Sequence, residues 1–379
     1  MITRTAISPV NGTRADIAML LDECHLMLKI TDESLNFGEQ LAAANSALEA
    51  LFSSRLEGTI PIFVRYFISD ASNQTAPLLE GASPLLAAAA RSIVQQPPLD
   101  GTKLAIWVYL QRGVNPKPLE GWGVELQRGA YTHLWSGYAF SREEGSRAQT
   151  YSLLDNYSTM LLNRGMSLLD NTVRTWFYVH DVDVNYKGVV EGRNELFARE
   201  GLTKDSHFIA STGIAGRHAD SAVKVLMDCY SVDGISEEQS QLLYAPTHLN
   251  PTYEYGVSFE RGVALHFGDR SQAYISGTAS INNKGEVVHV GDVQAQCGRM
   301  CENVEKLLSE VDMNFDDVVS LIVYLRDMAD AKVVEAFFKR VLPDVPTVMV
   351  LAPVCRPQWL VEMECVAIKE QIDLRFDLF

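Results

Sequence analysis

The most regular alternation of apolar and polar residues lies near the C-terminus, in LVEMECVAI at residues 360–368. In a β-strand, successive side chains point to opposite faces. One face of this segment is apolar and consists of Val361, Met363, Cys365 and Ala367. The other face carries two acids and consists of Leu360, Glu362, Glu364 and Val366. We expect the apolar face to pack on helices, and the acidic face either to contact solvent or to line a functional site.

Helix and strand patterns recur along the chain in the same order. The last third predicts a helix, a strand, a helix and two strands over 292–311, 318–327, 332–342, 347–356 and 360–368. The middle third repeats this order over 146–165, 171–181, 188–201, 207–217 and 222–232. The first third predicts a degraded version, with helices over 38–54 and 76–93, strands over 60–70 and 103–113, and no clear opening hairpin. The three stretches therefore predict related α/β units.

Short motifs support the repeat. GVELQRG at 123–129 resembles GVSFERG at 256–262, and in each copy a His follows the Arg by five residues. An Asn in the first helix precedes an Asp after the strand at similar distances, in the pairs Asn45 and Asp70, Asn156 and Asp181, and Asn303 and Asp327. Segments marked by Pro and Gly over 115–122 and 244–256 separate the copies. We predict an α/β (α+β) fold of three units at 1–120, 121–245 and 246–379.

Composition restricts the kind of partner. The formal net charge of −16 is unfavourable for binding nucleic acid or an anionic membrane surface, because both depend on clustered Lys and Arg. A small anionic metabolite remains possible, because a pocket needs only a few arginines. The N-terminus does not resemble a signal peptide, no apolar run is long enough to span a membrane, and the six cysteines form no CxxC pair. We expect a cytoplasmic protein that needs no metal and no organic cofactor, and self-association stays open.

The C-terminal third resembles the Rid/YjgF superfamily through AYISGTASINNKGEVVHVGDVQAQCGRMCENVEKLL, VYLRD and WLVEMECVAI. The likeness extends over 256–370 and, more weakly, over 123–234. It implies ββαβαββ units that assemble as trimers with sites in the clefts between them, so three units in one chain imply an intramolecular pseudo-trimer. The imine and enamine deaminases of this superfamily hold a substrate carboxylate with an Arg. The matching position here is Val348.

The chain also resembles the chorismatases, which hydrolyse chorismate and release pyruvate. The matching segments are RTW at 174–176, STGIAG at 211–216, PTYEYG at 251–256 and CRPQWLVEME at 355–364. The resemblance implies that Glu362 is the acid, and that Cys355 with Gly216 accompanies formation of 3-hydroxybenzoate. The family tends to have a His where this chain has Arg217.

The expected chemistry fits these residue types. Cleavage of an enolpyruvyl ether needs a general acid that is still protonated near neutral pH, and a buried Glu362 close to Glu364 would have a raised pKa. The two carboxylates of chorismate need cationic anchors, and the guanidinium group of Arg binds carboxylate in a bidentate manner. Glu362 and Cys355 are the expected catalytic residues. The expected binding residues are Arg356, Arg261, Arg174, Arg217, Gly216, Tyr255 and Glu364.

Structural interpretations of the same residues remain open at this stage. Cys355 can be an ordinary core thiol, and Arg174 can pair with Asp181. Arg261 and Arg128 occupy the same place in the repeated motif, so a structural role repeated in each unit is as open as a binding role. The alternatives to a chorismatase-like enzyme are a Rid-type imine or enamine deaminase and a metabolite-binding protein without catalysis.

Overall fold

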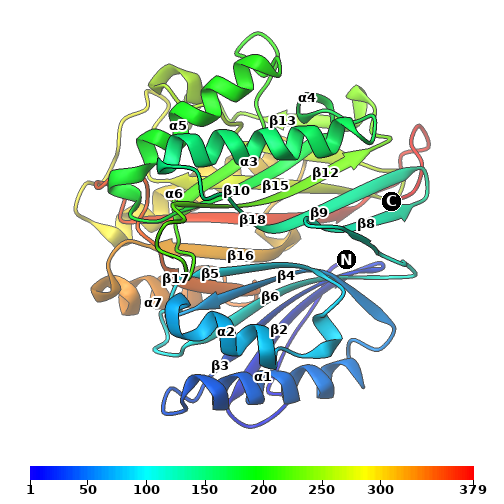
Figure 1. The fold of residues 1–379 in the computed structure, drawn as a ribbon, viewed down its shortest axis with the longest axis vertical. Coiled ribbons are helices and arrows are strands. Elements are labelled where there is room, and N and C mark those ends of the chain that lie inside the picture. Colours follow the sequence, from blue (N-terminus) through cyan, green and yellow to red (C-terminus); the bar gives the residue numbers. More distant parts are fainter.

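The computed structural model describes residues 1–379, apart from the side chain of Tyr255. The chain forms three six-stranded mixed sheets, and Figure 1 shows the helices on the outer sides of these sheets. The first sheet and its helices comprise β1 Thr3–Ile7, β2 Thr13–Leu20, β3 Glu23–Ile30, α1 Phe37–Phe52, β4 Thr59–Ile68, α2 Ala71–Gly81, β5 Ala90–Gln95 and β6 Leu104–Arg112.

The other two sheets repeat this order. The middle unit comprises β7 Lys117–Leu119, β8 Gly123–Arg128, β9 Tyr131–Phe140, α3 Gly145–Leu162, α4 Leu168–Asn171, β10 Thr172–Val179, α5 Val182–Arg199, β11 Ala210–Ala215 and β12 Val225–Asp233. The last unit comprises β13 Ser240–Leu243, β14 Gly262–His266, β15 Arg270–Ala279, α6 Val293–Ser309, β16 Val318–Leu325, α7 Ala331–Val341, β17 Thr347–Leu351 and β18 Val361–Glu370. Short 3₁₀ helices occur at Pro84–Leu86, Glu237–Gln239, Thr252–Tyr255, Phe315–Asp317 and Met328–Asp330.

Strand pairing confirms the predicted ββαβαββ repeat. The strand orders are β1-β2-β3-β6-β4-β5, β11-β10-β12-β9-β8-β7 and β13-β14-β15-β18-β16-β17. In each sheet one pair is parallel, namely β4 with β5, β10 with β11, and β16 with β17. A helix connects the two strands of each parallel pair, as a crossover between parallel strands requires. The three sheets are therefore copies of one unit, each preceded by one added edge strand.

The three units are arranged cyclically around a shared core. Strand β5 contacts β9 of the middle unit, β11 contacts β15 of the last unit, and β17 contacts β3 of the first unit. Aromatic side chains of the first and middle units meet at the centre, where the rings of Trp107 and Trp176 lie 6.5 Å apart. The largest hydrophobic cluster contains buried residues from all three sheets. This is the pseudo-trimeric arrangement that the sequence predicts.

Two predictions for the first unit are wrong. The unit does have an opening hairpin, because β2 pairs with β3 through a turn at Leu21, which adopts a positive φ of 54°. The two turn residues are Leu21 and Asp22, and no Gly or Asn stands at the position of positive φ, so the usual hairpin signal is missing. The helix expected over 76–93 is instead α2, which ends at Gly81, followed by strand β5. The alanines at 87–90 favour a helix locally, but pairing of β5 with β4 overrides that preference.

The equivalence of Arg128 and Arg261 is also wrong. Arg128 ends strand β8, pairs with Asp22 of the first unit and donates to the carbonyl oxygen of Phe379. Arg261 precedes strand β14 and donates to the carbonyl oxygen of Asn250 at 2.9 Å. The two seven-residue motifs are therefore not structurally equivalent. The first forms strand β8, whereas the second ends at the first residue of strand β14. Among the described residues, no helix combines the length and the apolar character needed to cross a membrane.

Arg65 on β4 joins the units at their centre and provides a test of this fold. Its side chain is fully buried, and Nη2 lies 3.0 Å from Oδ2 of Asp228 on β12. Nη1 lies 3.6 Å from Oε1 of Glu364 on β18. We expect Arg65→Met to lower the free energy of unfolding by about 3–5 kcal/mol, because it leaves the buried Asp228 without its cation and removes one of the two arginines beside Glu364.

Urea denaturation measures this effect. Arg14→Met is the matched control, because the side chain of Arg14 is half exposed in its ion pair with Asp16. We expect this control to change the free energy of unfolding by less than about 1 kcal/mol. An equally small loss for Arg65→Met would contradict the role of Arg65 at the centre.

Candidate active site

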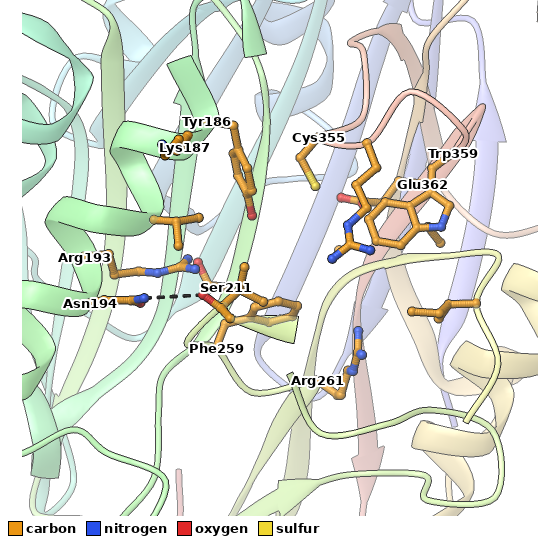
Figure 2. Close-up of a pocket in the computed structure, with 18 of the residues that line it drawn as sticks. Tyr186, Lys187, Arg193, Asn194, Ser211, Phe259, Arg261, Cys355, Trp359 and Glu362 are labelled. Carbon is orange, nitrogen blue, oxygen red and sulfur yellow. Dashed lines mark hydrogen bonds between the residues drawn. The ribbon is translucent and has the colours of Figure 1, made fainter. Parts of the chain in front are cut away.

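A cavity of about 450 Å³ lies between the middle and last units. Figure 2 shows Tyr186, Lys187, Arg193 and Asn194 of α5 on one side, and Cys355, Trp359 and Glu362 on the other. The remaining described lining comes from β11, from β15 and from the segment that precedes β14. The full lining consists of Tyr186, Lys187, Val190, Glu191, Arg193, Asn194, Ser211, Gly213, Gly256, Val257, Phe259, Arg261, Gly277, Ala279, Ile281, Cys355, Arg356, Trp359 and Glu362. This is one of the clefts between units, where the resemblance places a site.

Glu362 lies in the wall of the cavity on β18 and is only 5% exposed. Its Oε1 sits 2.3 Å from the point where a Cβ of residue 277 would stand, so Gly277 leaves the space that the carboxyl group occupies. Burial, followed by the negative charge of Glu364, raises the pKa of Glu362 to about 8. The carboxyl group is therefore protonated at neutral pH and able to act as a general acid.

Cys355 faces the same space from the loop before β18. Burial, followed by the charge of Glu362, raises its pKa to about 12, while a hydrogen bond with Tyr186 acts in the opposite direction. The side chain is therefore a thiol at neutral pH. A Cβ on Gly213 would come within 2.8 Å of the Tyr186 ring, so the glycine makes room for the ring that contacts the thiol.

Cations surround the cavity in a chain whose net charge is −16. Arg193 of α5 is 1% exposed, and Arg261 is 5% exposed on the opposite side (Figure 2). The guanidinium carbon of Arg356 lies 5.0 Å from the centre of the Trp359 ring. Lys187 lies on the exposed side of α5. This concentration of positive charge suits a small anion with more than one carboxylate.

The segment between β13 and β14 forms part of the cavity wall and is fixed at several points. Arg261, at the end of this segment, donates to the carbonyl oxygen of Asn250 within it at 2.9 Å. Asn194 of α5 donates to the carbonyl oxygen of Gly256 at 3.4 Å and accepts a hydrogen bond from Ser258. Tyr255, an expected binding residue on this segment, lies outside the residues whose side chains the structure describes.

The structure brings together some of the predicted residues and separates others. Glu362, Cys355, Arg356 and Arg261 all line the cavity. Glu364 and Arg174 lie behind it, where Nη2 of Arg174 is 2.8 Å from Oε2 of Glu364. This contact contradicts the alternative in which Arg174 pairs with Asp181. The solvent-facing interpretation of the acidic strand face is also wrong, because Glu362 and Glu364 are 5% and 4% exposed.

Gly216 and Arg217 lie at a different interface, between the first and middle units. A Cβ on Gly216 would come within 2.7 Å of both Val94 and Tyr178. The backbone carbonyl of Arg217 accepts a hydrogen bond from the backbone N–H of Gln95 at 3.0 Å. The glycine of the STGIAG segment that lines the cavity is Gly213. The structure therefore places neither Gly216 nor Arg217 beside Glu362.

Several cavity residues are absent from the sequence-based prediction, among them Tyr186, Arg193, Asn194, Phe259 and Trp359. Three of them lie on α5 at positions 186, 193 and 194, with Val190 between them, and spacings of three and four residues define one face of a helix. The charged Arg193 on this partly apolar helix face could have indicated the site from the sequence. Within the part of the chain that the structure describes, no group of three or more His, Cys, Asp or Glu side chains is placed to hold a metal ion.

Comparisons with known proteins show which proteins this chain resembles. The profile of the family described as Endoribonuclease L-PSP matches residues 263–369. A RutC family protein of Pyrococcus horikoshii is 30% identical over 124 residues, which cover 30% of this chain and 98% of that protein. A 3-hydroxybenzoate synthase of Streptomyces hygroscopicus is 27% identical over 221 residues, which cover 51% of this chain and 62% of that protein.

A solved structure extends the likeness to most of the chain. The crystal structure of a chorismatase matches with a TM-score of 0.64 and 20% identity, covering 81% of this chain and 93% of that one. At this identity the match establishes the shared fold. The profile and the relatives confirm the resemblance carried by the C-terminal motifs, and the chain belongs to the Rid/YjgF superfamily, as a member with the three-unit fold of chorismatase.

Proposed function

We propose that the cavity binds chorismate, or a close relative with two carboxylates, and cleaves its enolpyruvyl ether with release of pyruvate. The observation that carries this proposal is a buried carboxyl group, protonated at neutral pH, in a cavity lined by Arg193, Arg261 and Arg356. The names of two relatives, the 3-hydroxybenzoate synthase and a chorismatase of Streptomyces rapamycinicus, support the same chemistry. Because the first of these is covered over only 62% of its length, the activity of the whole protein remains a proposal.

The reaction begins with proton transfer from Glu362 to the terminal methylene carbon of the enolpyruvyl group. A hydroxyl group of the ring captures the resulting oxocarbenium ion. The bond between this hydroxyl oxygen and the ring then breaks, as does the original ether bond at the pyruvyl carbon, so pyruvate leaves with the hydroxyl oxygen and the hydroxyl proton passes to the ether oxygen that stays on the ring. Capture by water would instead leave a dihydroxy-diene acid. Conversion of chorismate to 3-hydroxybenzoate and pyruvate is balanced without net consumption of water. Aromatisation of the ring releases one proton, which restores the protonated Glu362. A general acid with a pKa near the working pH is suited to both proton transfers.

The side chains of Arg356 and Arg261 anchor the substrate carboxylates. Arg261 also holds the segment between β13 and β14 through Asn250, so its substitution would alter that segment as well. Arg356 is the clearer test. We expect Arg356→Met to raise KM for chorismate about 10- to 100-fold, because it removes a charge-assisted hydrogen bond to the substrate.

Steady-state kinetics measure this effect. Arg340→Met is the matched control, because Arg340 stacks on Phe337 at 5.6 Å on the exposed side of α7, as Arg356 stacks on Trp359. We expect the control to keep the wild-type KM. An unchanged KM in Arg356→Met would remove Arg356 from substrate binding.

The experiment that tests the reaction is incubation of the purified protein with chorismate. Pyruvate is measured with a coupled lactate dehydrogenase assay, and the ring product is identified by liquid chromatography and mass spectrometry. We expect pyruvate and 3-hydroxybenzoate in equal amounts. A dihydroxy-diene acid in place of the hydroxybenzoate would keep the enolpyruvyl cleavage and change the product. Chorismate binding without pyruvate would support the non-catalytic alternative.

The Rid-type deaminase alternative has no specific support at this site. The position of its carboxylate-binding Arg is Val348, which is 1% exposed on β17 and does not line the cavity. An assay with a small imino acid and detection of ammonia tests this alternative directly.

A further inference from the structure

Behind the cavity, the carboxylate of Glu364 is held by side chains from two other strands. Its Oε2 accepts a hydrogen bond from Nη2 of Arg174 at 2.8 Å. Its Oε1 accepts one from the indole N–H of Trp176 at 2.8 Å. Arg65 of the first unit lies 3.6 Å from the same Oε1. These interactions fix a charged, buried carboxylate two residues from Glu362 on the same strand face.

Thr212 on β11 connects this carboxylate to the site. Its hydroxyl donates to Glu364 and accepts a hydrogen bond from Arg174 at 2.5 Å. The same oxygen accepts the backbone N–H of Gly277 at 2.9 Å. The Thr212 hydroxyl thus makes one hydrogen bond as a donor and two as an acceptor, which is its full capacity. Thr212 is 1% exposed and does not line the cavity.

Gly277 contacts both Thr212 of this hydrogen-bond network and the proposed acid, Glu362. The missing Cβ of Gly277 would lie 2.3 Å from Oε1 of Glu362 and 3.1 Å from Cγ2 of Thr212. The carboxyl group of Glu362 and the methyl group of Thr212 therefore both pack against this residue. The hydrogen bond from Gly277 to Thr212 holds the backbone that supports the carboxyl group of Glu362.

We propose that Thr212 and Glu364 are a positioning pair for the carboxyl group of Glu362, and that the first unit acts on the site through them. The described lining of the cavity comes from the middle and last units alone, and the ion pair of Arg65 with Glu364 gives the first unit a route to it. This inference rests on the proposed role of Glu362 as the acid. It gives Glu364 a supporting role in place of the substrate contact expected from sequence.

The charges around Glu362 determine what each substitution does. The groups that face it are Glu364 on the same strand, Arg174 from β10, Arg261 from the segment before β14, Cys355 from the loop before β18 and Tyr324 from β16. Among them, Glu364 raises the pKa of Glu362, and the two arginines lower it. Thr212 carries no charge, so its removal tests position separately from charge.

The first test compares Thr212→Val with Thr212→Ser. Valine has a similar shape and lacks the hydroxyl, so we expect kcat for pyruvate release to fall about tenfold with KM unchanged, as for the loss of one buried hydrogen bond. Serine keeps the hydroxyl and is expected to restore most of the rate. Thr150→Val is the matched control, because this buried hydroxyl bonds only within α3. Wild-type kcat in Thr212→Val, or equal losses in both variants, would overturn the proposal.

The second test uses Glu364→Gln and needs no turnover. The infrared C=O band of protonated Glu362, identified by its loss in Glu362→Gln, reports the titration of this group directly. We expect the band to disappear at lower pH in Glu364→Gln, because the variant removes a negative charge and leaves Arg174 uncompensated. In Thr212→Val the band should keep its titration midpoint. An unshifted midpoint in folded Glu364→Gln would reject the inference.

These tests separate two kinds of failure. If wild-type protein releases no pyruvate from chorismate, the proposed reaction fails, while the infrared titration still decides whether Glu364 controls Glu362. If pyruvate is released but neither variant behaves as expected, the reaction remains and the positioning pair fails. Should Glu364→Gln not fold, the two Thr212 variants, which leave every charge in place, decide the outcome.

Discussion

Glu362→Gln is expected to lower kcat for pyruvate release by about 10²–10⁴-fold, the usual contribution of a general acid. Glutamine has the size of the buried carboxyl group beside Gly277, so the cavity keeps its shape while the transferable proton is lost. Pyruvate production measured at saturating chorismate gives the loss directly. Glu370→Gln is the matched control, because Glu370 ends the same strand at an exposed position. A variant that keeps wild-type kcat would show that another group supplies the proton.

The same residue determines the pH dependence. With a pKa of about 8, Glu362 is protonated below that value, so we expect kcat of the wild type to fall as pH rises through 8. The free energy of unfolding is also expected to fall as pH rises through 8. A carboxyl group binds more protons in the folded state when its folded pKa exceeds the unfolded value of about 4.3. This contribution to the free energy of unfolding is full below pH 4.3 and is lost as pH rises through 8, and Glu362→Gln should lack that loss.

The sequence allows the outline of the fold to be predicted because its units repeat. Three copies of one order of elements are visible even though the identity between them is low. Local signals failed where tertiary pairing decides the structure. The hairpin at Leu21 has a leucine where a positive φ favours Gly or Asn, and the alanines before Arg91 lead into a strand. Both segments take their form from neighbouring strands of the sheet.

Only the side of the site that the last unit contributes could be predicted, because the sequence motif lies there. Glu362 lies in a segment whose alternation places charge inside a strand, which is unusual for a buried position, and Cys355 lies just before that segment. Arg193 and Tyr186 come from the middle unit, so only the docking of two units brings them to the same cavity. The choice between Gly213 and Gly216 depends on which side of β11 faces the last unit. That choice is a tertiary property.

The repeat also explains why this cleft differs from the others. On the neighbouring strand, Tyr324 pairs with Glu362, Tyr178 pairs with Leu226, and Phe67 pairs with Ala105. The position of Glu362 therefore corresponds to Leu226 in the middle unit and to Ala105 in the first. A bulge in β15 contains Gly277, and the corresponding bulge in β9 contains Tyr138. The Tyr138 ring packs on His218 with 5.1 Å between ring centres. The cleft between the first and middle units therefore lacks the acid and contains a large side chain where Gly277 leaves space.

Gly277→Ala tests this argument with a single methyl group. Gly277 does not have a positive φ, so alanine is compatible with its backbone conformation. The added Cβ would stand 2.3 Å from Oε1 of Glu362 and 3.1 Å from Cγ2 of Thr212, so the carboxyl group must move. We expect kcat to fall about 10²-fold, since displacing a reacting group by about 1 Å has that effect. The overpacking should also lower the free energy of unfolding by about 1–3 kcal/mol.

Gly298→Ala is the matched control, because this glycine lies within helix α6 and nothing stands within 4 Å of its added Cβ. It should keep wild-type kcat and gain up to about 1 kcal/mol in the free energy of unfolding. A Gly277→Ala variant with wild-type kcat would contradict the placement of the acid.

A double-mutant cycle with Glu362→Asp separates displacement of the acid from general damage. The shorter aspartate withdraws from the added methyl group, so its cost to stability should be smaller in the Gly277→Ala background than in the wild type. Additive costs would mean that the methyl group and the carboxyl group do not meet. A positive coupling energy would place the acid against Gly277 in solution, where a proton can reach a substrate held by Arg356 and Arg261.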